Sequence, residues 1–370
     1  MPLESTALAQ TRAEVLAHLV LGFHGSSVPG EMAAMLADGL GGIALYPRNF
    51  TSPASLCALT DSLRRAATGP LLIGIDQEGG TRFALPPPFT VWPSPAALGR
   101  LGDAALVEEV ARAIATELRA VGVNTDFAPM LDLAVNPASP VTAGRSFGRD
   151  PHEVARLGVA FLRGLEAGGV LGCAKHFPGH GDTSMDPHLD LPCFGGTRER
   201  LEREELVPFA AAIDAGAPMV MTAHILLSEI DPDSPASIST AVLGGMLRRD
   251  LHFQGVILAD DLGMGALARR YGCGQSAVMT FGAGSDMAML CHDTSVVPGV
   301  IDAVTVALAG GCLDREQWAL SGLRVSILRE NIGALGEAAA QLEIVGCPAH
   351  QTLAREIQSR VDALGPGKRV

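Results

Sequence analysis

Residues 175–192 read KHFPGHGDTSMDPHLDLP and gather three histidines, three aspartates and one lysine in one polar run. Such side chains can carry a proton, hold a charge or bind a metal ion. Asp186 lies two residues before His188. A carboxylate so close to an imidazole can fix the tautomer of the ring and support its protonated form, which a general acid or base requires. The run therefore predicts proton transfer.

The spacing of the histidines disfavours a metal site. His176 and His180 are four residues apart, which places two ligands on one face only within a helix. The intervening residues 177–179 read Phe-Pro-Gly, which cannot form that helical turn. We expect no metal ion. The glycines at 38–42 and 77–80 are not followed by the Lys-Ser/Thr pair of a phosphate loop, so no nucleotide or other cofactor is expected.

Eight short apolar segments, separated mostly by helical patterns, are the elements that must position these side chains. They are LVLGF (19–23), GGIALY (41–46), LLIGID (71–76), NTDFAP (124–129), GCAKHF (172–177), MVMTAH (219–224), GVILAD (255–260) and DMAMLC (286–291). Such runs are typical of strands buried on both faces, as in a parallel sheet covered by helices. Eight of them alternating with helices predict a (β/α)₈ barrel of the α/β class, with a doubly wound open sheet as the alternative.

Two of the predicted helices have clear boundary signals. In residues 150–169, Asp150 is the expected N-cap, Pro151 the first helical residue and Glu153 the reciprocal capping residue. In residues 103–122, apolar residues recur at helical spacing and the pattern ends at Gly122. After about residue 295 only helical patterns follow. We expect one catalytic domain over residues 1–370, with the barrel at about 15–310 and a helical extension at about 311–365.

In such a barrel, the side chains at the carboxyl ends of the strands converge on one mouth, which carries the active site. The polar residues at these ends are Asp76, Asp126, Asp132, Lys175, His176, His224, Asp260 and Asp261. Asp260 is a carboxylate on a rigid element and is suited to be a nucleophile. A carboxylate nucleophile with one acid/base, for which we favour His188, indicates retaining glycoside hydrolysis.

The chain resembles glycoside hydrolase family 3, and specifically its single-domain β-N-acetylglucosaminidase (β-hexosaminidase) branch. The resemblance covers residues 19–291, where these segments occur in the expected order: LGGIALYPRNFTSP, GIDQEGG, AGRSFGRDP, KHFPGHGDTSMDPHLDLP, PASIS and GVILADDLGMGA. It implies a TIM-type barrel that hydrolyses terminal β-linked N-acetylglucosamine through a covalent glycosyl-aspartate. It also implies a role in peptidoglycan recycling.

The resemblance also implies the role of each site residue. Asp260 of ADDLGMGA is the implied nucleophile, and His188 is the implied acid/base with Asp186 as its partner. The residues implied to bind sugar hydroxyls are Asp76, Arg145, Lys175 and His176.

One segment departs from the family pattern. The family commonly reads R-V-x-R after DQEGG, and its second arginine touches the sugar, whereas this chain reads Thr-Arg-Phe-Ala at residues 81–84. Ala84 in the arginine's place predicts weaker binding of the sugar C4 or C6 hydroxyl. Arg82 remains a candidate contact by another path, and His224 is a second candidate.

Several polar residues have a structural interpretation instead. Asp261 is expected to complement a helix dipole near Leu262, and His180 and Asp182 to hold their loop by hydrogen bonds. The remaining histidines expected to be structural or exposed are His18, His152, His252, His292 and His350.

Composition limits the partners. The 370 residues carry a formal net charge of −13, which opposes binding to nucleic acid or anionic lipid, and no apolar run reaches the roughly 18 residues that cross a bilayer. The seven cysteines are scattered, which favours reduced thiols, and the N-terminus lacks the pattern of a signal peptide. We expect a cytoplasmic monomer whose partner is a saccharide containing N-acetylglucosamine, with no nucleic-acid or membrane partner.

Three alternatives stay open from the sequence. A neutral histidine does not repel phosphate as a carboxylate would, so the site could belong to a glycoside phosphorylase acting on β-N-acetylglucosaminides or β-glucosides. A family 3 β-glucosidase is the second alternative. A barrel that binds sugar without catalysis is the third, motivated by Ala84 alone.

Overall fold

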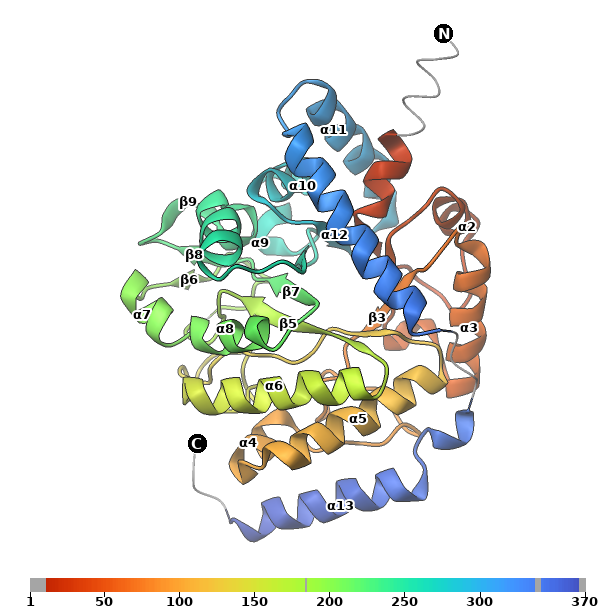
Figure 1. The fold of residues 1–370 in the computed structure, drawn as a ribbon, viewed down its shortest axis with the longest axis vertical. Coiled ribbons are helices and arrows are strands. Elements are labelled where there is room, and N and C mark those ends of the chain that lie inside the picture. Colours follow the sequence, from red (N-terminus) through yellow and green to blue (C-terminus); the bar gives the residue numbers. More distant parts are fainter. Residues whose placement is uncertain (1–10, 184, 337–340, 366–370) are drawn as a thin grey trace.

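Eight parallel strands form a closed barrel in the computed structural model, which describes residues 11–183, 185–336 and 341–365. The strands are β1 (Leu19–Leu21), β2 (Gly42–Ala44), β3 (Leu72–Ile75), β4 (Thr125–Asp126), β5 (Leu171–Phe177), β7 (Met219–Thr222), β10 (Val256–Ala259) and β11 (Met287–Leu290). Around the barrel their order is β1, β11, β10, β7, β5, β4, β3, β2. Each strand overlaps one of the eight apolar runs, so the predicted (β/α)₈ barrel is confirmed (Figure 1).

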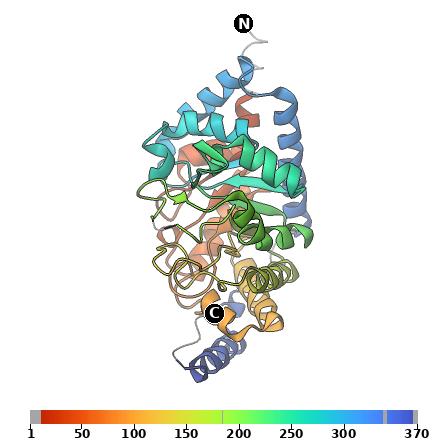
Figure 2. The same ribbon diagram turned by 90° about the vertical axis from the view of Figure 1, so that its left-hand side faces the viewer.

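Helices surround the barrel, as Figures 1 and 2 show. They are α2 (Gly30–Ala37), α3 (Pro53–Ala66), α4 (Pro95–Leu101), α5 (Ala104–Ala120), α6 (Pro151–Ala167), α7 (Arg198–Arg203), α8 (Leu206–Asp214), η3 (Ala241–Asp250), α9 (Gly265–Ala268), α10 (Gly272–Ala283), α11 (Val297–Ala309), α12 (Arg315–Ala334) and α13 (Pro348–Ala363). Among the described helices, none has both the length and the apolar character needed to cross a bilayer.

The boundary signals of α5 and α6 act largely as predicted. The apolar stripe of α5 is buried, and its partner α6 begins after Asp150, whose carboxylate accepts hydrogen bonds from the N–H groups of His152 and Glu153. The expected reciprocal cap by Glu153 is wrong, because its carboxylate pairs with Arg156 one turn along the helix. That exposed pair contributes little, so the cap of α6 depends on Asp150.

Helix α12 closes the end of the barrel opposite the mouth. Its Val325, Leu328 and Ile332 belong to the same buried cluster as the first residues of several strands, including Leu72 and Met219. Figure 1 shows α12 running obliquely across the barrel. Leu328 is only 3% exposed, so its truncation to alanine would cost roughly 2–5 kcal/mol of stability. The barrel is therefore open only at the carboxyl ends of its strands.

A small second sheet was not predicted. It consists of β6 (Cys193–Phe194), β8 (Leu226–Leu227) and β9 (Asp231–Pro235), in the order β6, β8, β9. The sheet ties the end of the histidine-rich loop to the segment after β7, because Leu226 N–H donates to the Pro192 carbonyl. It thus fixes where the loop returns to the barrel.

Candidate active site

One cavity of about 250 Å³ at the barrel mouth brings together all nine predicted site residues. They are Asp76, Arg82, Arg145, Lys175, His176, Asp186, His188, His224 and Asp260. A larger cavity of about 680 Å³ lies toward the amino ends of β10 and β11, between η3, α10 and α12. It contains none of the nine residues, so the smaller cavity is the candidate active site.

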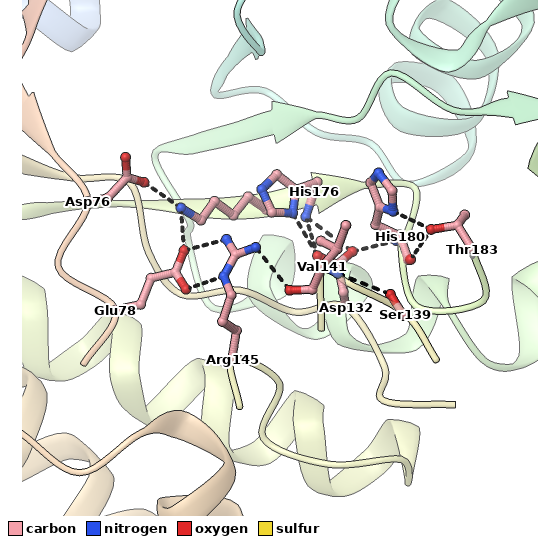
Figure 3. Close-up of polar contacts among 10 residues, drawn as sticks. Asp76, Glu78, Asp132, Ser139, Val141, Arg145, His176, His180 and Thr183 are labelled. Carbon is pink, nitrogen blue, oxygen red and sulfur yellow. Dashed lines mark hydrogen bonds and ion pairs between the residues drawn. The ribbon is translucent and has the colours of Figure 1, made fainter. Parts of the chain in front are cut away.

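A buried ion network forms one wall of the cavity (Figure 3). Lys175 on β5 places its Nζ 2.6 Å from Asp76 Oδ1 and 2.6 Å from Glu78 Oε1. Arg145, in the loop after β4, donates from Nε (2.8 Å) and Nη2 (2.7 Å) to the two oxygens of Glu78. Its Nη1 donates to the Val141 carbonyl at 3.0 Å. Both cationic side chains are therefore held in fixed orientations toward the cavity.

The charges of this network stabilise one another. Burial alone would raise the pKa of Glu78, but Lys175 and Arg145 outweigh it and lower that pKa to about 2. Burial would likewise lower the pKa of Lys175, but Asp76 and Glu78 raise it above its ordinary value. Glu78 is thus ionised and Lys175 protonated at neutral pH. Fixed charged groups of this kind are suited to bind the hydroxyls of a sugar.

Asp132 holds the start of the histidine-rich loop. Its Oδ2 lies 2.7 Å from His176 Nδ1, and its Oδ1 accepts the backbone N–H of His180 (Figure 3). Burial would raise the pKa of Asp132, but the nearby His176 outweighs it and the pKa is lowered. The ionised carboxylate fixes Nδ1 of His176 as a donor. The Nε2 of His176 is then left to face the cavity.

Asp260 stands directly after β10 at the floor of the cavity. Its Oδ1 accepts the backbone N–H of Asp261 at 2.8 Å. Burial would raise its pKa, but the surrounding His224, His176 and Lys175 side chains and the Asp261 N–H outweigh burial, so the pKa is lowered. An ionised carboxylate on a rigid strand end has the charge and position that a nucleophile needs.

His224 supports this turn. Its Nδ1 lies 2.7 Å from Ser237 Oγ, and its Nε2 lies 3.1 Å from the Asp261 carbonyl, to which it can donate. Both ring nitrogens are therefore occupied by protein partners, although the side chain lines the cavity. The arrangement favours the structural interpretation of His224 over direct substrate contact.

His188 and Asp186 form a pair at the rim. His188 Nδ1 lies 2.8 Å from Asp186 Oδ1, which also accepts the His188 backbone N–H at 2.9 Å. Burial would raise the pKa of Asp186, but these two hydrogen bonds outweigh it and the pKa is lowered. The His188 side chain is 61% exposed, so its Nε2 is open to solvent and to a substrate. The pair has the geometry that a general acid/base requires.

The loop that carries this pair is anchored at both ends. At its start, Gly181 packs so closely that an added Cβ would lie 2.0 Å from the Leu133 carbonyl oxygen. Between the two residues of the pair, the Pro187 carbonyl accepts the Ala266 N–H at 3.1 Å, and just beyond the pair Asp190 binds Arg270 at 2.9 Å. As expected, His180 holds the loop by a hydrogen bond, with Nδ1 2.6 Å from Thr183 Oγ1. Asp182 does so as well, through an ion pair with Arg200.

Arg82 does reach the cavity by another path, whereas Ala84 is not among the residues that line it. The Arg82 guanidinium donates to the Pro140 carbonyl and helps to lower the pKa of Asp186. Phe83 also lines the cavity, and the Arg145 guanidinium lies 4.1 Å from its ring centroid. This wall therefore presents an arginine near the loop and an aromatic ring beside the ion network.

Sequence reasoning missed two residues of the site: Glu78, which binds the cavity-lining Arg145 and Lys175, and His292, which lines the cavity. Glu78 is two positions after Asp76 at a strand end, a spacing that places both side chains on one face and could have indicated it. His292 follows β11, so the rule that located the other mouth residues also applied to it. The expectation that His292 is merely structural or exposed is incomplete, because the half-exposed ring lines the cavity and binds Asp261. The prediction that Asp261 complements the dipole of a helix near Leu262 is wrong, because α9 begins only at Gly265 and the Asp261 carboxylate binds the His292 ring instead.

The chain is similar to known proteins along most of its length. A family model described as "Glycosyl hydrolase family 3 N terminal domain" matches residues 16–326. A curated beta-hexosaminidase of Alkalilimnicola ehrlichii is 37% identical over 294 residues, which span 78% of this chain and 84% of that protein. A beta-hexosaminidase of Neisseria gonorrhoeae is 35% identical over 331 residues, 88% of this chain and 91% of the relative.

Solved structures agree with this likeness. A family 3 beta-N-acetylglucosaminidase from Paenibacillus sp. superposes with a TM-score of 0.91 at 37% identity, over 95% of this chain and 68% of that chain. The beta-N-acetylhexosaminidase of Beutenbergia cavernae gives a TM-score of 0.79 at 28% identity, over 87% of this chain and 98% of the other.

Proposed function

Because this chain belongs to glycoside hydrolase family 3, we propose that it is a retaining exo-β-N-acetylglucosaminidase that releases terminal β-linked N-acetylglucosamine. The observation that carries the proposal is the convergence of Asp260, the His188–Asp186 pair and the buried ion network on one cavity. The relatives that match most of the chain are named as beta-hexosaminidases, which supports the acetamido sugar as substrate.

In the first step Asp260 attacks the anomeric carbon as the bond to the leaving oxygen breaks. His188, in its protonated form, gives its Nε2 proton to that oxygen, and Asp186 stabilises the imidazolium and orients the ring. The products of this step are the free alcohol and a glycosyl ester of Asp260. Because Asp260 is half-buried and ionised before substrate binds, little reorganisation precedes the attack.

In the second step His188, now neutral, takes a proton from water as the water oxygen attacks the anomeric carbon. The ester bond breaks, Asp260 regains its negative charge, and two displacements on opposite faces leave the β configuration unchanged. The proton taken from water regenerates the imidazolium for the next cycle. Asp76, Lys175 and Arg145 are proposed to hold the sugar hydroxyls throughout, together with His176.

We propose a cytoplasmic role in peptidoglycan recycling, for a monomer whose catalytic residues all lie on one barrel domain. The cytoplasmic location is supported by the seven cysteines, which are all free thiols in the structure, as a reducing compartment favours. Cell fractionation with the native chain tests the location, and size-exclusion chromatography with light scattering tests the monomer.

The test of the activity compares 4-nitrophenyl β-N-acetylglucosaminide with the β-glucoside, each with and without phosphate. We expect turnover of the acetamido sugar in water, with β-N-acetylglucosamine as the first product seen by NMR. Release of a sugar 1-phosphate would instead identify a phosphorylase. Preference for the glucoside would identify a β-glucosidase, and binding without turnover would identify a sugar-binding barrel.

A further inference from the structure

Asp261, the residue after the proposed nucleophile, is fixed by several contacts. Its Oδ1 accepts the backbone N–H groups of Gly263 (2.9 Å) and Cys291 (3.2 Å). Its Oδ2 lies 2.6 Å from Nδ1 of His292. Its own backbone N–H donates to Asp260 Oδ1 at 2.8 Å, so the position of Asp261 determines which oxygen of Asp260 is engaged and which is free to attack.

His292 is the only titratable group among the three side-chain and backbone donors to the Asp261 carboxylate. His292 follows β11. It lies on the opposite side of the cavity from the ion network, in which Asp76 follows β3 and Lys175 lies on β5. Its side chain is 58% exposed, whereas that of Asp261 is 7% exposed. Within the described part of the chain, its Nε2 makes no hydrogen bond, so this nitrogen is open to the cavity.

We propose that His292 is a positioning residue for the nucleophile, which acts through Asp261 by a hydrogen bond and, when protonated, by its charge. This inference rests on the proposed function. The hydrogen bond keeps Asp261 in the orientation that directs its N–H at Asp260. The charge offsets the negative charge of Asp261, which stands next to Asp260 in the sequence and would otherwise disfavour its ionisation.

The charged and titratable groups around His292 follow three strands, β10, β2 and β1. Asp260 and Asp261 follow β10 and both raise the pKa of His292, the hydrogen bond to Asp261 being the larger cause. Arg48, after β2, lowers that pKa, as does burial. The Nε2 of His24, after β1, lies 3.2 Å from the His292 carbonyl oxygen. The ring centroids of Tyr46 and His292 are 6.1 Å apart. The net result is a pKa above the ordinary value, so the ring carries a proton over a wider pH range.

Two substitutions separate the hydrogen bond from the charge. His292→Asn places an amide N–H where Nδ1 stood and cannot titrate, whereas His292→Ala removes both the donor and the charge. We expect His292→Ala to lower kcat on the 4-nitrophenyl acetamido substrate by about tenfold, with KM nearly unchanged. His292→Asn should restore most of kcat at the pH optimum.

The acid limb of kcat/KM reports the ionisation of Asp260 in the free enzyme. Loss of the cation raises the pKa of that carboxylate, so in both variants the limb should move to higher pH by roughly half a unit. Because a merely structural histidine would not move this limb, the shift is the decisive readout.

His350→Asn is the matched control, because His350 also pairs with a buried carboxylate, Glu117, at 2.8 Å, but lies outside the cavity. It should leave kcat and the pH profile unchanged. An unchanged kcat and acid limb in His292→Ala would overturn the inference. So would a rise in KM alone, since that indicates a direct substrate contact. Failure of the wild type to turn over any of the substrates would count against the proposed function instead.

Discussion

The carboxylate of Glu78 lies 2.6 Å from Nζ of Lys175, and both side chains are almost completely buried, at 1% and 2% exposure. The same carboxylate binds Arg145 through two parallel hydrogen bonds. One acidic residue therefore orients two of the cations that we propose to hold the sugar. Removing its charge would leave two buried cations with only the partly exposed Asp76 as a charged partner in the network.

Glu78→Gln should therefore impair both stability and binding. We expect a loss of about 3–5 kcal/mol in the free energy of unfolding, as for other broken buried ion pairs. We also expect a higher KM, because Lys175 and Arg145 lose their fixed orientation. Urea unfolding and steady-state kinetics measure the two effects. Glu204→Gln, which breaks surface pairs with Arg200 and Arg203, is the control and should change stability by less than about 1 kcal/mol.

The same ion network should make the free energy of unfolding decrease over a defined range of acidic pH. The folded-state pKa of Glu78 is about 2, below the ordinary value of 4.5, so its contribution is fully present above about pH 4.5 and disappears as pH falls toward 2. The stability difference between wild type and Glu78→Gln should shrink over that range. Unfolding free energies measured from pH 2 to pH 7 test this, and a difference independent of pH would contradict it.

Asp260→Ala should abolish hydrolysis, because no ester can form. We expect kcat to fall by at least about 10³-fold, and azide, a small anionic nucleophile, to restore part of the turnover with an α-glycosyl azide as product. Product analysis by NMR checks the configuration. Asp103→Asn, at the N-cap of α5 and far from the cavity, is the control and should retain normal kcat. Retained activity in Asp260→Ala would mean that another group attacks the sugar.

His188→Ala should show a dependence on the leaving group. A nitrophenolate leaves without protonation, whereas a sugar alkoxide needs a proton, so the loss should be about 10²–10⁴-fold on a disaccharide and smaller on the nitrophenyl substrate. Kinetics on both substrates check this, with His152→Ala, an exposed histidine of α6, as the control. Equal losses on both substrates would argue against a general acid.

Much of the barrel could be predicted because its strands are buried on both faces and therefore apolar in local sequence. Because the carboxyl ends of barrel strands converge on one mouth, the positions of Asp260, Lys175 and His176 could then be predicted without any knowledge of distant contacts. The segment Asp231–Pro235 could not be predicted as a strand, because its sequence DPDSP is polar and contains two prolines. It is a strand because it pairs with Leu226–Leu227, which only the folded chain brings beside it.

The spacing of Glu78 from Asp76 could have indicated a position at the barrel mouth, but its ion pairs could not be predicted, for a related reason. Its partners Arg145 and Lys175 are 67 and 97 positions away, and a carboxylate in a glycine-rich turn has no local signature of an ion pair. The sequence-based reading of His292 depended on residue type alone, whereas its contact with Asp261 joins the ends of two different strands. Local patterns thus predicted the elements and most polar residues of the cavity, but not the contacts of Glu78 and His292, which only the folded chain brings about.

Because Val325, Leu328 and Ile332 of α12 pack against the far end of the barrel, the candidate active-site cavity opens only at the barrel mouth. A saccharide can enter only with its terminal unit leading, and the released monosaccharide must leave through the same opening that the next chain end has to enter. The departing sugar and the incoming substrate therefore compete for one passage. Accumulated N-acetylglucosamine should for this reason slow the proposed enzyme as a competitive inhibitor, without any separate regulatory site.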